Sequence, residues 1–303
     1  MDRFSATDAA LAGFRVAREK PKAILVWALI MAVLSFGVAA AAAASFGDKL
    51  TALQEVVSSQ SDPDPQAMMA MMGPMWPLFI GSMVYVLITN SVLLAAVNRL
   101  VLRPHDNKAA YLRLGMDELR QAVVQVLLYV ILCAAYFVGV VVLAVLAGIG
   151  AAIGGKVLGI FLGVLSFFAV VGGLIFLSLR LSFVSTLAFD TRRIDLKGSW
   201  KMTEGKAWPL FGTYAVAAIL AFVVYLLLLV IILAVTAAFG GLNAAGDALQ
   251  QDINSLASVL SPGGVVRALL SGLMSVLLSL IVFAPAPSLY ALFKGRDEVE
   301  TFS

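Results

Sequence analysis

The sequence predicts an all-α protein that crosses a membrane several times. Hydrophobic residues make up 61% of the 303 residues and charged residues only 13%, about half the charged share of an ordinary soluble domain. Several apolar runs exceed the roughly 20 residues that an α-helix needs to cross the hydrocarbon core of a bilayer. No series of alternating ten-residue strands indicates an outer-membrane barrel. We therefore expect one polytopic membrane domain over residues 1–303, with six transmembrane helices joined on one side by amphipathic interfacial helices.

The N-terminal segment 1–22 is predicted to lie on the membrane surface. It is too polar to enter hydrocarbon, yet Phe4, Leu11 and Phe14 recur at near-helical spacing opposite charged residues, as in interfacial helices. Pro21 is expected to end this helix. The first span follows at 23–45 and closes with six consecutive alanines. Although this end resembles a signal-peptidase site, two features favour an uncleaved span: the polar leader is long and carries acidic residues, and the apolar run is longer than that of a signal peptide.

A polar loop is expected between the first two spans, over residues 46–75. Its tract SSQSDPDP is typical of an exposed loop. The methionine-rich run MMAMMGPM that follows has two interpretations, a soft packing segment or a copper-binding cluster. Packing is favoured because methionine fills irregular gaps and no histidine or cysteine is nearby.

The second span is predicted over 77–101, and a second amphipathic segment follows it. Four apolar residues of this segment are expected to share one helical face. They are Tyr111, Leu112, Met116 and Leu119. The opposite face would then carry Arg113, Asp117 and Arg120.

The third and fourth spans are predicted over 122–153 and 157–181. Only the tripeptide GGK separates them, so the two spans should form an antiparallel hairpin. Small residues along both spans favour close backbone approach. Gly159 and Gly163 form a GxxxG pattern, which is a weak signal for dimerisation in a glycine-rich chain.

The fifth and sixth spans are predicted over 210–239 and 265–293. The loop between them, residues 240–264, contains no lysine or arginine. Near the end of the sixth span stand Pro285 and Pro287, which are expected to kink or break the helix because proline donates no backbone hydrogen bond.

The distribution of basic residues predicts the orientation of the chain. Eighteen lysines and arginines fall on one side of the six spans, and only Lys49, Lys156 and Arg267 fall on the other. By the positive-inside rule both termini are expected in the cytoplasm.

Three similar units can be recognised in this layout, each made of a surface helix, a span, a loop and a span. Charges also recur at i, i+4 and i+7 in 113–120 and 197–204. Two interpretations stay open: three helical-hairpin repeats, or the shared physics of amphipathic entry helices.

The most patterned stretch runs from Arg180 to Trp208 and reads RLSFVSTLAFDTRRIDLKGSWKMTEGKAW. An arginine ending one span, a Ser-Trp helix and a Gly-x-x-Trp leading into the next span resemble the glycerophosphoryl diester phosphodiesterase membrane domains of bacteria and the related inner-membrane proteins of the YciC type. The residues that carry the resemblance are Arg180, Leu181, Ser199, Trp200, Thr203, Gly205 and Trp208, with Pro285, Pro287 and Tyr290 similar to the closing helix. The resemblance implies a bacterial inner-membrane location. Only ten residues follow Phe293, where the fused enzymes of the family carry a catalytic barrel, so we expect no phosphodiesterase activity.

No catalytic or metal-binding pattern is recognisable. The chain has no HExxH, Walker or GxSxG motif, and its single histidine, His105, and single cysteine, Cys133, argue against metal sites. We therefore predict that the protein is not an enzyme and carries no metal or cofactor. The basic residues are spread along a membrane interface without a reader motif, which argues against nucleic-acid binding.

Two sets of residues are candidate sites. The first is a lipid-headgroup site at the interface, for which snorkelling to water is the simpler reading of Arg180. This set comprises Arg180, Arg192, Arg193, Lys197, Lys201, Trp200 and Trp208. The second is a polar path within the membrane, comprising Asn90, Gln125, Tyr129 and Thr213.

These sites correspond to two functional hypotheses. The first is a non-enzymatic scaffold that binds anionic lipid, a protein partner or a second copy of itself in membrane or envelope homeostasis. The second is a small transporter or lipid-moving protein with a path between the hairpins, for which the glycine-rich spans and the proline break are the motivation. The absence of carboxylates within the spans argues against an ion-driven carrier.

Overall fold

The computed structural model describes residues 6–58, 65–249 and 255–302, and within these ranges the chain is helical and contains no strand. The all-α prediction is thus confirmed. The elements are α1 (Ala6–Ala10), α2 (Ala12–Glu19), α3 (Pro21–Ser58), α4 (Pro65–Met72), η1 (Gly73–Met75), α5 (Trp76–Leu102), η2 (Lys108–Tyr111), α6 (Met116–Arg180), α7 (Val184–Thr191), α8 (Leu196–Met202), α9 (Ala207–Leu249), α10 (Leu256–Leu260), α11 (Pro262–Phe283) and α12 (Pro285–Phe302).

Within the described residues, five helical stretches are long and apolar enough to cross a membrane, so the chain is a helical membrane protein. The stretches are Pro21–Val56, Met68–Leu102, Lys108–Thr191, Ala207–Ala238 and Pro262–Gly295. The third stretch contains two predicted spans, because α6 turns back on itself at Gly154 and Gly155. Gly155 has φ of 70°, a left-handed conformation that glycine adopts without a steric penalty.

The two limbs of α6 pack tightly through small residues. A Cβ added to Gly159 would lie 2.8 Å from the Cβ of Ala151 and 3.0 Å from the carbonyl oxygen of Ala147. A Cβ added to Gly163 would lie 3.5 Å from the Cβ of Ala147. The GxxxG pattern therefore faces the other limb of the same hairpin.

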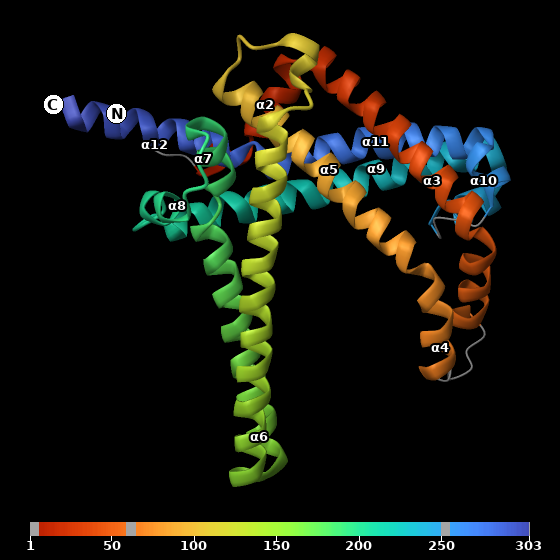
Figure 1. Cartoon of the computed structure of the whole chain (residues 1–303), viewed down its shortest axis with the longest axis horizontal. Helices are drawn as coiled ribbons and strands as arrows, with labels where there is room; N and C mark the ends of the chain where they lie inside the picture. The colour runs from red at the N-terminus through yellow and green to blue at the C-terminus, as the bar shows by residue number, and fades with distance from the viewer. Residues whose placement is uncertain (1–5, 59–64, 250–254, 303) are drawn as a thin grey trace.

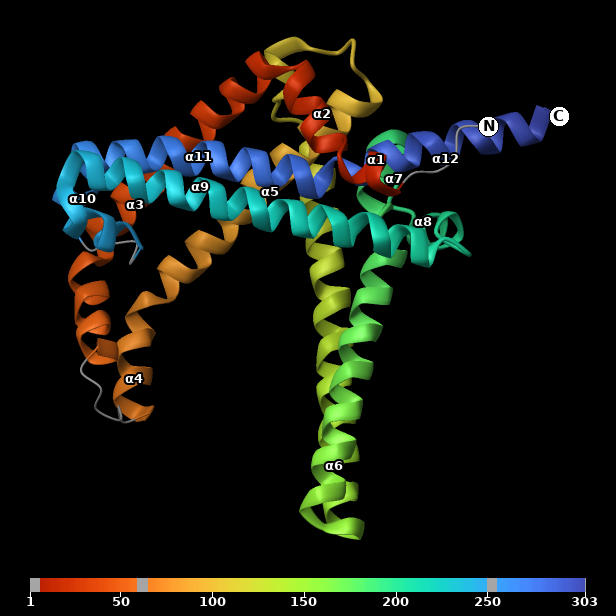
Figure 2. The ribbon, with the colours of Figure 1, turned by 180° about the vertical axis from the view of Figure 1, so that it is seen from behind.

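The long helices diverge from a common end of the molecule. In Figures 1 and 2, α9 and α11 run side by side while the α6 hairpin extends across their direction. Helix α11 packs most extensively on α3, whereas α3 and α5 share few contacts. The three expected hairpins are therefore packed in three different ways, and no threefold repeat is visible.

Several helices extend beyond the predicted spans. Helix α3 continues to Ser58 and α9 to Leu249, through segments expected to be loops. Most of the tract SSQSDPDP lies outside the described residues. Helix α2 ends at Glu19, just before Pro21, as predicted. Pro21 also begins α3, because proline is well suited to the first helical turn. Hydropathy locates the edge of the hydrocarbon, whereas a helix continues into water until a breaker ends it.

The N-terminal segment contains two helices, and the predicted apolar face points outward. Leu11 and Phe14 are 40% and 38% exposed. The buried face consists of small residues, and at Gly13 an added Cβ would lie 2.6 Å from the carbonyl oxygen of Leu280 in α11. Helix α2 thus packs on the protein with its small side, leaving Leu11 and Phe14 for the surroundings. Phe4 lies outside the described residues.

The second predicted amphipathic helix is wrong over most of its length. Helix α6 begins only at Met116, and Ala109, Ala110 and Tyr111 have left-handed φ values of 51°, 52° and 67°. Tyr111 is buried, whereas Met116 and Leu119 are exposed, so the expected common face does not form. The recurrent charges are not equivalent either, because they stand partly outside α6 and α8.

Candidate functional site

The four basic segments that the sequence assigns to one side of the membrane meet at one end of the molecule. Helix α12 contacts α1, α2, α5 and α7, and α7 contacts α5, α6 and α8. Figure 1 shows α7, α8 and α12 gathered at the open end of the α6 hairpin, opposite its turn. The candidate headgroup residues lie at this end.

Arg180 joins the end of α6 to α8. Its carbonyl oxygen accepts hydrogen bonds from Ser199 Oγ at 2.8 Å and from Thr203 Oγ1 at 3.5 Å. Both hydroxyl residues are buried. The Arg180 guanidinium in turn donates from Nη1 to the carbonyl oxygen of Trp200 at 3.3 Å. Four residues of the motif Arg180–Trp208 therefore form a single structural joint.

The Arg180 guanidinium lies against two aromatic rings. Its Cζ is 5.1 Å from the ring centroids of both Phe176 and Trp200, a distance at which cation–π attraction is effective. The Nε atom is buried without a hydrogen-bond partner. Among the residues that the structure describes, no carboxylate pairs with this guanidinium. The positive charge of Arg180 thus contacts aromatic rings but has no ion-pair partner among the described residues.

Four more basic residues extend this surface and complete what we call the Arg180 corner. Arg192, Arg193, Lys197 and Lys201 are exposed, and none has an ion-pair partner in the described part of the chain. Asp195 caps α8 instead, accepting a hydrogen bond from the Gly198 amide at 2.7 Å. The corner comprises Arg180, Arg192, Arg193, Lys197, Lys201, Trp200 and Trp208, and its two tryptophans are 43% and 82% exposed.

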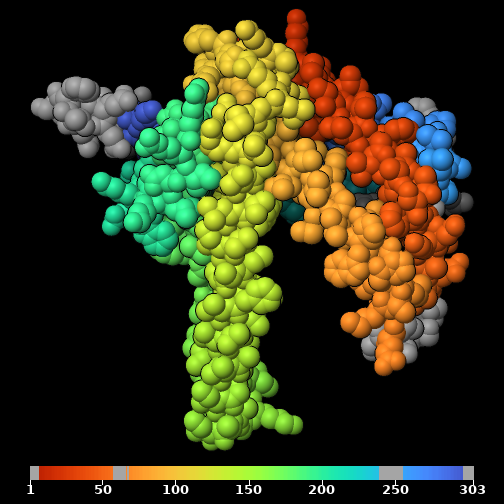
Figure 3. All heavy atoms as spheres, viewed as in Figure 1, coloured from red at the N-terminus to blue at the C-terminus, as the bar shows by residue number. Residues whose placement is uncertain are grey.

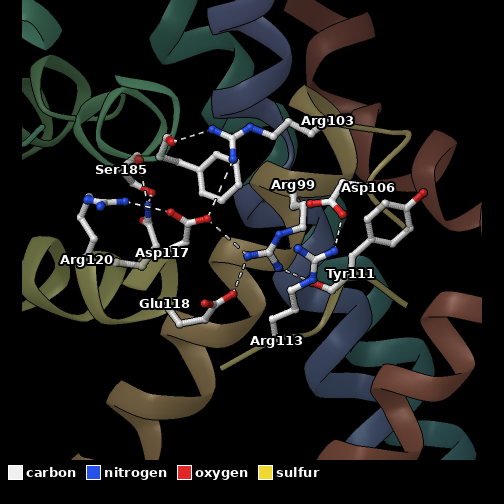
Figure 4. Close-up of polar contacts among 11 residues, drawn as sticks. Arg99, Arg103, Asp106, Tyr111, Arg113, Asp117, Glu118, Arg120 and Ser185 are labelled. Atoms are coloured by element: carbon white, nitrogen blue, oxygen red, sulfur yellow. Dashed lines mark hydrogen bonds and ion pairs between the residues drawn. The ribbon is translucent and has the colours of Figure 1, made fainter. Parts of the chain in front are cut away.

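A buried ion pair at the same end was missed by sequence reasoning. Arg99, at the end of α5, is 2% exposed and donates from Nη2 to Glu118 Oε1 at 2.7 Å (Figure 4). A second donor of Arg99, Nη1, bonds the carbonyl oxygen of Tyr111. The sequence carries a signal for this pair, because Arg99 ends a predicted span and is followed by the adjacent carboxylates Asp117 and Glu118. The positive-inside pattern alone gives Arg99 no partner.

Asp117 connects this pair to two further arginines. It lies 3.7 Å from Arg99, 3.9 Å from Arg103 and 2.9 Å from Arg120. The ring of Phe189 in α7 stacks near Arg99 and Arg103, at 5.7 Å and 4.7 Å from their Cζ atoms. Each of these three arginines therefore has a carboxylate partner, in contrast to the basic residues of the Arg180 corner.

Uncharged side chains extend the network into the interface of α5, α6 and α7. Ser185 Oγ donates to Gln121 Oε1 at 2.6 Å, and Gln121 Nε2 donates to the Ser185 carbonyl oxygen at 3.0 Å. Asn98 donates to Ser185 Oγ at 3.4 Å and accepts from Thr186 Oγ1 at 3.2 Å. All four residues are buried, so these bonds satisfy polar groups that would otherwise be costly.

The left-handed turn at Ala109–Tyr111 is fixed by hydrogen bonds from distant residues. Trp27 Nε1 in α3 donates to the carbonyl oxygen of Ala110 at 2.6 Å. The Tyr111 hydroxyl donates to the carbonyl oxygen of Pro104 at 2.9 Å. A left-handed non-glycine residue costs on the order of 1–3 kcal/mol, and these bonds, together with that from Arg99, offset the strain.

An exposed ion pair closes the outer side of the same loop. Arg113 donates to Asp106, and this hydrogen bond lowers the pKa of the Asp106 carboxyl below its ordinary value despite some desolvation. Asp106 therefore remains ionised at neutral pH.

The proline break connects α11 to a helix that is bonded to α7. Helix α11 ends at Phe283 and α12 begins at Pro285, with Pro287 in its first turn. Tyr290 OH and Lys294 Nζ donate to the same Asp190 oxygen at 2.7 Å and 2.8 Å. The break thus redirects the chain towards the common end.

No hydrogen bond joins any two of the four residues of the predicted polar path. Tyr129 is 55% exposed, while buried Thr213 bonds its own helix at the Pro209 carbonyl oxygen. Gln125 is buried and its Nε2 lacks a partner. Asn90 is only half-buried.

An apolar cleft of about 600 Å³ lies where α5, α6, α9 and α11 diverge. None of the predicted path residues lines it. Its wall on the α6 side carries Ser178, Ser182 and Ser185, and Tyr214 hydrogen-bonds with Ser182. The remaining lining residues are Leu94, Leu174, Ile175, Leu179, Phe211, Ala215, Val282, Phe283 and Ala286.

The described residues include no group of three or more histidine, cysteine, aspartate or glutamate side chains arranged to hold a metal. What the site offers chemically is a set of unpaired cations beside exposed indoles, and near it an uncharged cleft. No family model, curated protein or solved structure matches the chain, so the resemblance described above remains a prediction.

Proposed function

We propose that this membrane protein is a non-enzymatic scaffold that binds anionic lipid headgroups at the Arg180 corner. The supporting observation is the contrast between two groups of basic residues at the same end. Arg99, Arg103 and Arg120 each pair with a carboxylate, whereas the cations of the corner lack such partners among the described residues. Each basic residue near an anionic leaflet contributes about 1 kcal/mol of attraction.

The proposed setting is the bacterial inner membrane, with six spans and both termini in the cytoplasm. Two spans are then the separate limbs of α6. This setting is supported by the positive-inside pattern and by the meeting of the basic segments at one end. Exposed Trp200 and Trp208 suit the headgroup level of a bilayer. The proposed role in membrane or envelope homeostasis includes binding a protein partner or a second copy.

The proposal is tested by identifying the lipids that co-purify with the protein in native lipid discs. A variant with Arg180→Gln, Lys197→Gln and Lys201→Gln should lose anionic lipid selectively. A matched control, Lys20→Gln, Lys22→Gln and Lys108→Gln, removes the same charge from exposed positions outside the corner and should retain it. Equal lipid profiles in all three proteins would contradict the headgroup site, and a stoichiometric protein partner would instead favour scaffolding through protein contacts.

A second candidate function, lipid movement or transport, is favoured by the apolar cleft beside the proline break. Ala286, between the two prolines, lines the cleft. Flux of a labelled lipid in reconstituted vesicles that disappears with Pro285→Ala would support this function. A scaffold predicts no flux in any of these proteins.

A further inference from the structure

The cleft at the divergence of the long helices has the properties of a hydrocarbon site. Its walls come from α5, α6, α9 and α11, with one residue each from the starts of α7 and α12, and all of them belong to stretches that are long and apolar enough to cross a membrane. No charged side chain is among the residues that line it. A charged headgroup would be unpaired there, which is costly in an apolar site.

The size of the cleft argues for a thin occupant. An α-helix with side chains is about 10 Å wide and rises 1.5 Å per residue, so a volume of 600 Å³ would hold only about five helical residues. A helix from a partner or a second copy could therefore not be enclosed within the cleft. The volume is within the range of about 300–1,000 Å³ that is usual for small-molecule sites.

The few polar groups of the cleft are hydroxyls, those of Ser178, Ser182 and Ser185 and that of Tyr214 in α9. Ser178 Oγ donates to the Leu174 carbonyl oxygen in α6, and Ser182 Oγ, in the turn after α6, donates to the Leu179 carbonyl oxygen, at 2.8 Å each. Such hydroxyls are neutral donors that can turn towards an ester carbonyl. The opposite walls, which include Leu94, Phe211 and Phe283, present hydrocarbon apart from the Tyr214 hydroxyl.

We propose that this cleft binds an acyl chain of a membrane phospholipid, with the chain among the apolar walls and its ester end towards the serine hydroxyls. The proposal rests on the proposed function only in taking the ligand to be lipid. The cleft has no charged lining residue and should therefore not distinguish lipids by headgroup charge. The Arg180 corner is proposed to prefer lipids with anionic headgroups.

The test uses the full chain in lipid discs with a phosphatidylcholine that carries a photoactivatable diazirine in one acyl chain. Cross-links mapped by mass spectrometry should concentrate on residues 174–185 and 211–215. Ala215→Trp, which fills the cleft, should reduce them several-fold, and Leu174→Trp on the facing wall should do the same if Ala215→Trp fails to fold. Ala218→Trp is the matched control, because Ala218 is exposed on the same helix and does not line the cleft.

Cross-links spread evenly over the outer faces of α6 and α9, or unchanged in both cleft variants, would overturn the proposal. Labelling by a photoactivatable free fatty acid but not by the phospholipid would also overturn it. The variant with three neutralised basic residues should keep the cleft labelling, because the probe lipid has no net charge. Loss of anionic selection with intact labelling, or the reverse, therefore separates the two proposals.

Discussion

Arg99 is the residue on which the polar network depends, by which we mean the ion pairs and hydrogen bonds described above where α5, α6 and α7 meet. It is the largest buried charged side chain, and its donors reach both Glu118 in α6 and the backbone of the left-handed turn. Replacing a buried ion pair by apolar residues is often tolerated, but removing one partner leaves an uncompensated charge. The pair therefore fixes how α5, η2 and α6 meet.

Arg99→Leu should lower the free energy of unfolding by about 3–5 kcal/mol, because Glu118 would remain buried and unpaired. Denaturant unfolding in detergent micelles measures this change. Arg113→Gln, which removes the exposed ion pair with Asp106, is the control and should have little effect. Equal destabilisation by both substitutions would show that burial of the Arg99 pair is unimportant.

Trp27→Phe should lower the free energy of unfolding by about 1–3 kcal/mol, because the Ala110 carbonyl oxygen would lose its donor within a buried site. Thermal unfolding of the two proteins provides the comparison, with Trp76→Phe as the control at an indole that is 64% exposed. A Trp27→Phe protein as stable as the parent would mean that the turn at 109–111 is held without this bond.

At this scale the sequence predicts residue types better than their partners. The basic residues of the Arg180 corner could be selected because they cluster in the chain. The pairing of Trp27 with Ala110 joins positions 83 residues apart, and no local periodicity indicates it. Three consecutive left-handed residues without glycine are equally invisible, since tertiary hydrogen bonds impose them.

At the scale of elements, close helix contact depends on glycine at particular positions. A Cβ added to Gly272 in α11 would lie 2.5 Å from the Ala28 carbonyl oxygen and 2.5 Å from the Ala32 amide nitrogen of α3. Both atoms belong to the backbone, so relief requires movement of a whole helix. Interfaces of membrane helices commonly use small residues in this way.

Gly272→Ala should destabilise the protein by about 1–3 kcal/mol through overpacking, although alanine is the better helix former. Thermal stability in detergent measures the effect. Gly172→Ala is the matched control, because a Cβ there meets nothing within 4 Å, and it should be neutral or slightly stabilising. A stable Gly272→Ala protein would mean that α3 and α11 separate at little cost.

The helices themselves could be predicted because apolar runs of this length have few alternatives in a bilayer. Their partners could not. The sequence favoured pairing neighbours along the chain, yet α3 packs on α11 through small residues such as Gly272. The hairpin within α6 was predictable from its short GGK turn, which leaves the limbs no other partner.

At the scale of the molecule, the helices fan out from the polar network. The space-filling view in Figure 3 shows the α6 hairpin standing free, with an open wedge between it and α4 and α5. Because α9 and α11 run across the hairpin, both groups cannot cross one flat hydrocarbon layer of about 30 Å along its normal in this arrangement. We expect the outer parts of the fan to move together in a bilayer, while the polar network and the adjoining cleft, which share Ser185, form its fixed end.

This narrowing should shorten the distance between spin labels at Lys156, in the α6 turn, and Leu260, at the end of α10. Both positions are exposed, and both are predicted on the same side of the membrane. Pulsed electron resonance in lipid discs, compared with the structure, measures the change, and labels at Lys197 and Lys108 near the fixed end should keep their separation. An unchanged distance between 156 and 260 would place α9 and α11 in the plane of the membrane.

The self-contained packing of the α6 hairpin has a consequence for biogenesis. Because Gly159 and Gly163 lie against the other limb of α6, the two limbs can pack on each other before any other helix is present. The turn between them carries a single charge, Lys156, whose passage through the bilayer centre costs about 2.5–3.5 kcal/mol on insertion scales. The hairpin can therefore enter the membrane as one unit during synthesis. The polar network forms later, once α7 supplies Ser185 and Thr186.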